Sequence, residues 1–156
     1  MIDYQWGDLP LHVLLVHLVV VIVPAAALCL LLSAFWPAAR IRLGIVSMFV
    51  ALVALIAVPA TVTAGDWLYL RVESTPLIER HAALGPILLP WVIAMFGVTS
   101  VVWLWYFLAP RVPRTARIVA IVVLDVAAVV TAIGSVVAVV LVGESGAAAV
   151  WTGKFG

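Results

Sequence analysis

Charge and cysteine are both scarce in this sequence, and each shortage excludes a class of function. Charged residues make up 10% of the 156 residues, and the formal net charge is only +1. No run of Lys or Arg alternates with aromatic residues, which excludes a nucleic-acid-binding surface. The single cysteine, Cys29, lies in an apolar run, so the sequence excludes an internal disulfide and a cysteine-based zinc motif.

Familiar catalytic motifs are missing as well. The sequence contains no Gly-rich phosphate-binding loop, no zincin helix and no CxxC pair. Ser145 lies near the C-terminus, but it lacks the flanking residues of a nucleophile elbow. We therefore favour a protein that is not a hydrolase, is not nucleotide-dependent and has no enzymatic activity of its own.

What the sequence has in excess is apolar side chains. Hydrophobic residues make up 67% of the chain, well above the share in soluble globular proteins. A soluble domain of this size buries only about two-thirds of its unfolded surface, so the excess requires lipid as a second apolar solvent. The first apolar run follows Asp3 and Asp8 and is longer than the core of a signal peptide, so we expect it to remain as a membrane span.

Four apolar runs are each long enough to cross a bilayer as a helix, which takes about 20 residues. They cover residues 11–35, 43–63, 82–109 and 118–142. Hydrocarbon cannot satisfy an unpaired backbone, and the runs lack the alternation of barrel strands. The sequence therefore predicts a single all-α domain, residues 1–156, folded as an up-down-up-down transmembrane four-helix bundle.

The positions of the charges predict the orientation of this bundle. The two short connections between spans carry basic residues and no acid: Arg40, Arg42, Arg111, Arg114 and Arg117. The opposite side carries six acidic residues against three basic ones: Asp3, Asp8, Asp66, Glu73, Glu79 and Glu144 against Arg71, Arg80 and Lys154. By the positive-inside rule, the arginine-bearing connections face the cytoplasm and both termini are external. We expect a multi-pass protein of the cytoplasmic membrane of a bacterium.

Small and helix-breaking residues predict how the spans pack. Small residues recur three or four positions apart in the second and fourth spans, as Gly44, Ser47, Ala51 and Ala54, and as Ala127, Thr131, Ser135 and Ala138. Such stripes let neighbouring helices approach closely. Pro24, Pro86 and Pro90 predict bends in the first and third spans. The external connection from Gly65 to Arg80 mixes apolar and charged residues, which predicts a segment lying along the interface.

All three histidines, His12, His17 and His81, fall in the external half of the predicted bundle, close to Glu144 and Asp66. Imidazole is a common ligand of haem iron and of other transition metals. One hypothesis is therefore a haem b or metal site formed by His12, His17 and His81, with Glu144 as a further metal ligand. His12 and His17 are about 140° apart on an ideal helix, so both cannot face one metal without a bend. The alternative is a set of interfacial histidines that only make hydrogen bonds.

Asp125 is the only acidic residue deep in a span. A charged carboxylate at mid-membrane costs about 3 kcal/mol on insertion scales, so we expect Asp125 to point into the bundle. Thr99 and Ser100 lie at a similar depth on the third span and are candidate partners. Asp125 either takes part in a proton-coupled step or is a neutral carboxyl that hydrogen-bonds two helices.

Several segments resemble one known family. The stretch His12-Val13-Leu14-Leu15-Val16-His17 resembles the His-Pro-Leu-Leu-Val-His-Phe-Pro start of a family of small four-span prokaryotic membrane proteins without an agreed activity. The segments 64–68, 79–81 and 143–151 look like its actinobacterial members, although Val13 and Leu18-Val19 depart from the family's proline and Phe-Pro. The resemblance implies the four-span topology, and relatives beside cytochrome-like domains imply a redox-linked role for the histidines.

Three functional hypotheses follow. The first is a non-enzymatic accessory or scaffold subunit, whose partners are the lipid bilayer and either another membrane protein or a second copy of the chain. The second is an electron-transfer or metal-handling protein that uses His12, His17 and His81. The third is a proton-coupled permease centred on Asp125, which would need to oligomerise to build a pathway.

Overall fold

Helices dominate the structure. The computed structural model describes residues 4–108 and 112–154. Its elements are β1 (Gln5–Trp6), β2 (Leu9–Pro10), α1 (Leu11–Phe35), α2 (Pro37–Tyr69), α3 (Pro76–Leu84), the single 3-10 turn η1 (Gly85–Ile87), α4 (Leu88–Leu108) and α5 (Arg114–Trp151). The predicted all-α fold, with four helices long and apolar enough to span a membrane, is confirmed.

The helices extend further than the apolar runs from which they were predicted. The first helix matches its predicted range, but α2 begins at Pro37 and continues to Tyr69, and α5 continues to Trp151. Hydropathy marks where lipid contact ends, whereas a helix ends only where its backbone hydrogen bonds stop. The last residue of the third predicted span, residue 109, lies outside the described residues.

The connection predicted as a loop from Gly65 to Arg80 is mostly helical in the structure. Helix α2 runs through Gly65, and only residues 70–75 of this stretch lie outside helices. Thr75 then starts α3, because its Oγ1 accepts a hydrogen bond from the backbone N–H of Ile78 at 3.3 Å. The connection is thus a short turn followed by a capped helix.

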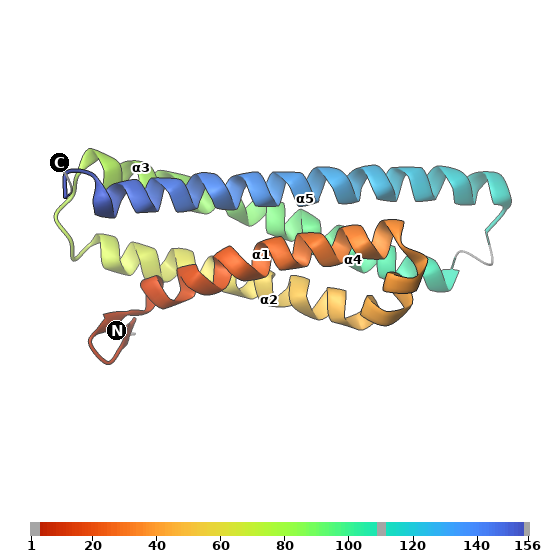
Figure 1. Ribbon diagram of the computed structural model, residues 1–156, viewed down its shortest axis with the longest axis horizontal. Helices are drawn as coiled ribbons and strands as arrows, with labels where there is room; N and C mark the ends of the chain where they lie inside the picture. The colour runs from red at the N-terminus through yellow and green to blue at the C-terminus, as the bar shows by residue number, and fades with distance from the viewer. Residues whose placement is uncertain (1–3, 109–111, 155–156) are drawn as a thin grey trace.

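The long helices lie side by side, and both chain termini lie at the same end of the molecule (Figure 1). We call this end the terminal end; it also holds the β1–β2 hairpin, α3 and the C-terminal part of α5. The opposite end, which holds the α1–α2 and α4–α5 connections, is called the loop end. Helix α1 packs against α2 and α5, while α4 also packs against both α2 and α5.

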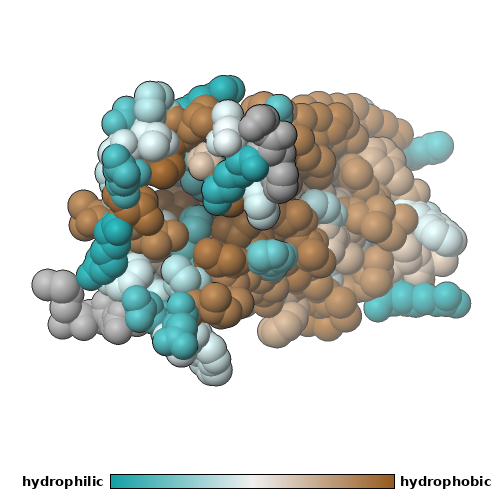
Figure 2. All heavy atoms as spheres, turned by 60° about the vertical axis from the view of Figure 1, so that its left-hand side comes forward, coloured by the Kyte–Doolittle hydropathy of each residue, from teal (hydrophilic) through white to brown (hydrophobic). Residues whose placement is uncertain are grey.

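Small side chains line the helix contacts, as the two predicted stripes require. Most members of both stripes are buried: Ser47, Ala51, Ala54, Thr131, Ser135 and Ala138. Gly134 allows the closest approach of all, because a Cβ there would lie 2.0 Å from Cζ3 of Trp91 on α4. Large apolar side chains instead cover the outer surface of the body, while hydrophilic ones gather at the terminal end (Figure 2). This is the surface pattern of a chain whose middle is solvated by lipid.

The prolines occupy three kinds of position. Pro24 lies inside α1, and Pro59 lies inside α2, where sequence reasoning had not considered a bend. Pro86 belongs to the 3-10 turn η1. Pro90 lies in the first turn of α4, where a helix has no partner for its backbone N–H groups. Pro24 and Pro59, which lie inside α1 and α2, therefore each remove an internal helical hydrogen bond.

Candidate metal site

His12 is positioned at the terminal end by the hairpin that precedes α1 and by a contact with α2. Its Nδ1 lies 2.9 Å from the backbone oxygen of Thr61. One turn further along α2, Gly65 leaves room for the imidazole, because a Cβ on residue 65 would lie 2.9 Å from the same Nδ1. The ring is half-buried. Two residues of α2, four positions apart, thus fix its place.

His81 approaches the same region from α3. Its Nδ1 lies 2.9 Å from Oγ of Ser145 on α5, and this hydroxyl in turn donates to the backbone oxygen of Val142 at 2.8 Å. Ser145 is buried, with 7% of its surface exposed. Gly146 again leaves room, since a Cβ there would lie 3.0 Å from Cε1 of His81. Both histidines are therefore seated against glycine on a neighbouring helix.

The hydrogen-bond partners restrict where the proton lies on each ring. A backbone carbonyl only accepts, so Nδ1 of His12 carries the hydrogen and donates it to Thr61. In the neutral ring, Nε2 of His12 then has a lone pair. Nδ1 of His81 donates to Ser145 when the Ser145 hydroxyl donates to Val142, and the backbone of Val142 is also within hydrogen-bonding reach of the His81 ring. In that arrangement Nε2 of His81 is the ring nitrogen with a lone pair.

The two rings lie at a separation that suits a shared ligand. Their centroids are 6.1 Å apart, and their planes meet at 70°. Two imidazoles that bind one metal through nitrogens at about 2.0–2.1 Å place their ring centroids roughly 5–6 Å apart, with the larger value for a more linear arrangement. Histidine ligands also usually donate the other ring N–H to an oxygen that fixes the tautomer. The pair has both properties.

The structure does not bring the other two candidate ligands to this pair. His17 is exposed, and its Nδ1 donates to the backbone oxygen of Val13 on its own helix at 2.6 Å. Glu144 is exposed as well. Within residues 4–108 and 112–154, no group of three or more His, Cys, Asp or Glu side chains is arranged to hold a metal ion. A metal between His12 and His81 would thus have two protein ligands and open positions.

Sequence reasoning missed four residues of this site. Thr61 and Ser145 supply the acceptors, while Gly65 and Gly146 supply the space. The four-residue spacing of Thr61 and Gly65 places them on one face of a helix, but nothing in the sequence states which neighbour that face meets. The partners of the histidines come from inter-helix register, which spacing along the chain does not encode.

Asp125 lies in a different place, on the side of the bundle near the loop end. It lines a recess of about 310 Å³ together with Phe35 of α1 and four valines of α5. The predicted partners Thr99 and Ser100 instead each donate to a backbone oxygen of their own helix, at 2.7 and 2.8 Å. Asp125 is instead within electrostatic range of Arg40.

Comparison with known proteins identifies a family to which the sequence is similar. The profile of the family described as "Predicted membrane protein (DUF2231)" matches residues 8–156, which is nearly the whole chain. No curated protein and no solved structure matches the chain.

Proposed function

The chain belongs to the DUF2231 family of predicted membrane proteins, and from that premise we propose that it is a multi-pass membrane protein that binds a redox-active transition metal and takes part in electron transfer. The metal, either a single ion or the iron of haem b, is held between Nε2 of His12 and Nε2 of His81. Both sources present the same chemistry, a Lewis-acidic metal that accepts two neutral imidazoles.

One observation carries this proposal. Two histidines that are 69 positions apart in sequence meet at the terminal end, where their ring centroids are 6.1 Å apart and each Nδ1 lies 2.9 Å from an oxygen. Oxygen partners at Nδ1 are typical of histidines that bind a metal through Nε2.

The site is tested by measuring metal and haem in protein purified in mild detergent. Elemental analysis detects a bound ion, and the Soret band with a pyridine haemochromogen assay detects haem b. We expect one of them at close to one equivalent in the wild type. His12→Asn and His81→Asn keep a donor near the position of Nδ1 but lack Nε2, so both should lose the metal while far-UV circular dichroism stays unchanged.

His17→Asn is the matched control, because His17 lies on the same helix as His12 but bonds only to its own backbone. It should keep full metal content. Equal metal content in all three variants, or a wild type that takes up neither haemin nor a divalent ion in titration, would refute the site. That result would favour the accessory-subunit hypothesis, which makes no demand on the imidazoles.

The orientation is part of the same proposal. Four described arginines lie at the loop end, Arg40, Arg42, Arg114 and Arg117, whereas Arg71, Arg80 and Lys154 lie at the terminal end among most of the acidic residues. The positive-inside rule then supports a cytoplasmic loop end in a bacterial cytoplasmic membrane, with the histidine pair on the outer side. In a Cys29→Ala background, an impermeant maleimide should label Thr152→Cys in intact cells but Ala38→Cys only after permeabilisation. The reverse pattern would overturn this orientation.

A further inference from the structure

A second cavity lies at the loop end, between α1, α2 and α4. Its volume is about 590 Å³, within the range of about 300–1,000 Å³ typical of small-molecule sites. The walls are mainly apolar, and the polar and aromatic lining residues are Ser33, Arg40, Ser47, Thr99, Trp103 and Tyr106. An apolar cavity with a few convergent polar groups is the usual form of a ligand site.

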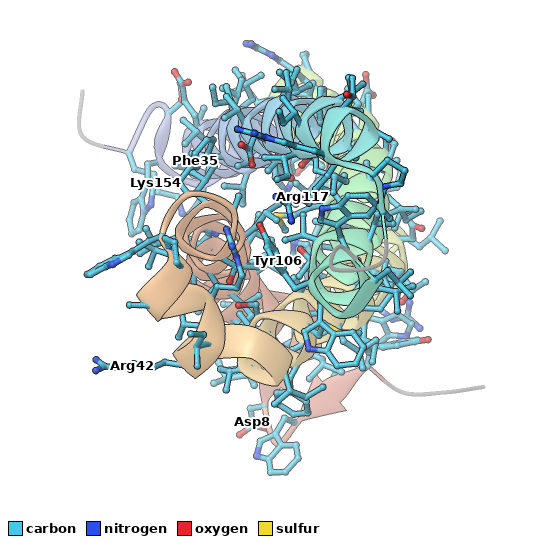
Figure 3. All side chains as sticks on the ribbon, turned by 90° about the vertical axis from the view of Figure 1, so that its right-hand side faces the viewer. Asp8, Phe35, Arg42, Tyr106, Arg117 and Lys154 are labelled. Carbon is cyan, nitrogen blue, oxygen red and sulfur yellow. The ribbon has the colours of Figure 1, made fainter. Side chains whose placement is uncertain are left out.

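Arg40 is held firmly at the mouth of this cavity. Its Nε donates to the backbone oxygen of Ser33 at 2.6 Å, and one of its terminal nitrogens donates to the oxygen of Ala34. The guanidinium carbon lies 3.5 Å from the centroid of the Tyr106 ring. Tyr106 lies between the helices near the middle of the bundle, whereas Arg42 projects away from it (Figure 3). Of the five N–H groups of a guanidinium, these bonds use two, so three remain for a ligand.

The opposite wall adds hydroxyl groups and space. The hydroxyls of Ser33 and Ser47 lie 2.9 Å apart and are buried, so they form a polar spot inside the cavity. Gly44 keeps the wall open, since even a Cβ there would lie 3.9 Å from Nε1 of Trp103. The cavity beside the Tyr106 ring and the Arg40 guanidinium is therefore suited to a flat head group with oxygen acceptors.

Charge decides between the two classes of lipid that could supply such a head. Among the described residues that line the cavity, Arg40 is the one cation. An anionic phosphate head usually needs several cations or a basic pocket, and a single arginine does not form one. A neutral head with carbonyl acceptors needs only a hydrogen-bond donor, which Arg40 supplies. We propose that this cavity binds the head group of an isoprenoid quinone, with a quinone carbonyl accepting from Arg40 and the prenyl tail leaving between the helices into lipid.

This proposal stands apart from the histidine pair. Along α1, His12 and Ser33 are separated by roughly 30 Å at 1.5 Å per residue, and no residue lines both sites. Quinone binding is measured on protein whether or not it holds metal. One proposal can therefore fail while the other stands.

The test measures binding of a short-chain ubiquinone or menaquinone analogue to the detergent-solubilised full chain by equilibrium dialysis. We expect saturable binding of about one molecule per chain, weakened at least tenfold in Arg40→Gln and in Gly44→Leu. Gly44→Leu fills the cavity without touching Arg40, so it keeps the test decisive if Arg40→Gln folds poorly. Arg42→Gln is the control and should bind as the wild type does.

Three results would overturn the proposal. They are the absence of saturable quinone binding, equal binding in Gly44→Leu and the wild type, and the finding that the cavity holds an anionic lipid instead. The last is tested by mass spectrometry of lipid that co-purifies from vesicles of phosphatidylcholine and phosphatidylglycerol. Stoichiometric phosphatidylglycerol that is lost in Arg40→Gln would assign the cavity to a phosphate head.

Discussion

The contact between Gly134 and Trp91 yields a sharp prediction about stability. A Cβ on residue 134 would lie 2.0, 2.1 and 2.5 Å from three carbons of the indole of Trp91. Non-bonded carbons normally stay about 3.5–4.0 Å apart, so Gly134→Ala must shift the indole or separate α4 from α5 by roughly 1.5 Å. Overpacking of this kind costs about 1–3 kcal/mol.

A second effect of the same substitution has the opposite sign. Alanine is favoured over glycine inside a helix by about 0.5–1 kcal/mol, so the expected net change for Gly134→Ala is a loss of about 0–2.5 kcal/mol. Gly143→Ala is the matched control, because residue 143 lies on the same helix and a Cβ there meets nothing within 4 Å. It should leave stability unchanged or raise it slightly.

Equilibrium unfolding in mixed dodecylmaltoside and SDS micelles measures the difference between the two variants. The reasoning fails if Gly134→Ala is as stable as Gly143→Ala. A double-mutant cycle identifies the cause: in a Trp91→Leu background the steric conflict is relieved, so Gly134→Ala should then cost nothing. A cost that persists without the indole would show that another contact is responsible.

Three further predictions concern single side chains. Ser135 is fully buried and its hydroxyl has no hydrogen-bond partner among the described residues, so Ser135→Ala should be neutral or stabilising by about 1 kcal/mol in the same unfolding assay; a clear loss would reveal a hidden partner. Gly65→Ala pushes a methyl group against His12 and should weaken metal binding at least tenfold in a competition titration, although both ligands remain; unchanged affinity would contradict the seating of that ring. Arg40→Ala breaks two hydrogen bonds to α1 and a cation–π contact and should cost about 1–3 kcal/mol, while Arg42→Ala should cost almost nothing; equal losses would refute this role.

The fold was predictable because it follows from the hydropathy of consecutive residues, which can be read directly from the sequence. Apolar side chains of about 20 consecutive residues require lipid, and lipid requires helices. The ends of α2 and α5 were not predictable in the same way, because polar residues such as Asp66 and Glu144 continue a helix as well as they end an apolar run. Hydropathy therefore located the spans and underestimated the helices.

The candidate site was only partly predictable. Clustering of histidines at one end followed from the topology, but the structure pairs His12 with His81 and leaves His17 on the surface. That choice depends on how α1 is rotated about its own axis, which is set by packing against α2. Arg40 is a similar case: it was predicted only as a topology signal, yet its side chain folds back over the last carbonyls of α1.

The length of α5 has a consequence for how the molecule meets its surroundings. Its 38 residues correspond to roughly 57 Å at 1.5 Å per residue, nearly twice the hydrocarbon thickness of about 30 Å. Even with a normal tilt, a continuous rod must emerge from the bilayer. The same helix carries Ser145 and Gly146, which contact His81, so the histidine pair is attached to a helix longer than the hydrocarbon can cover.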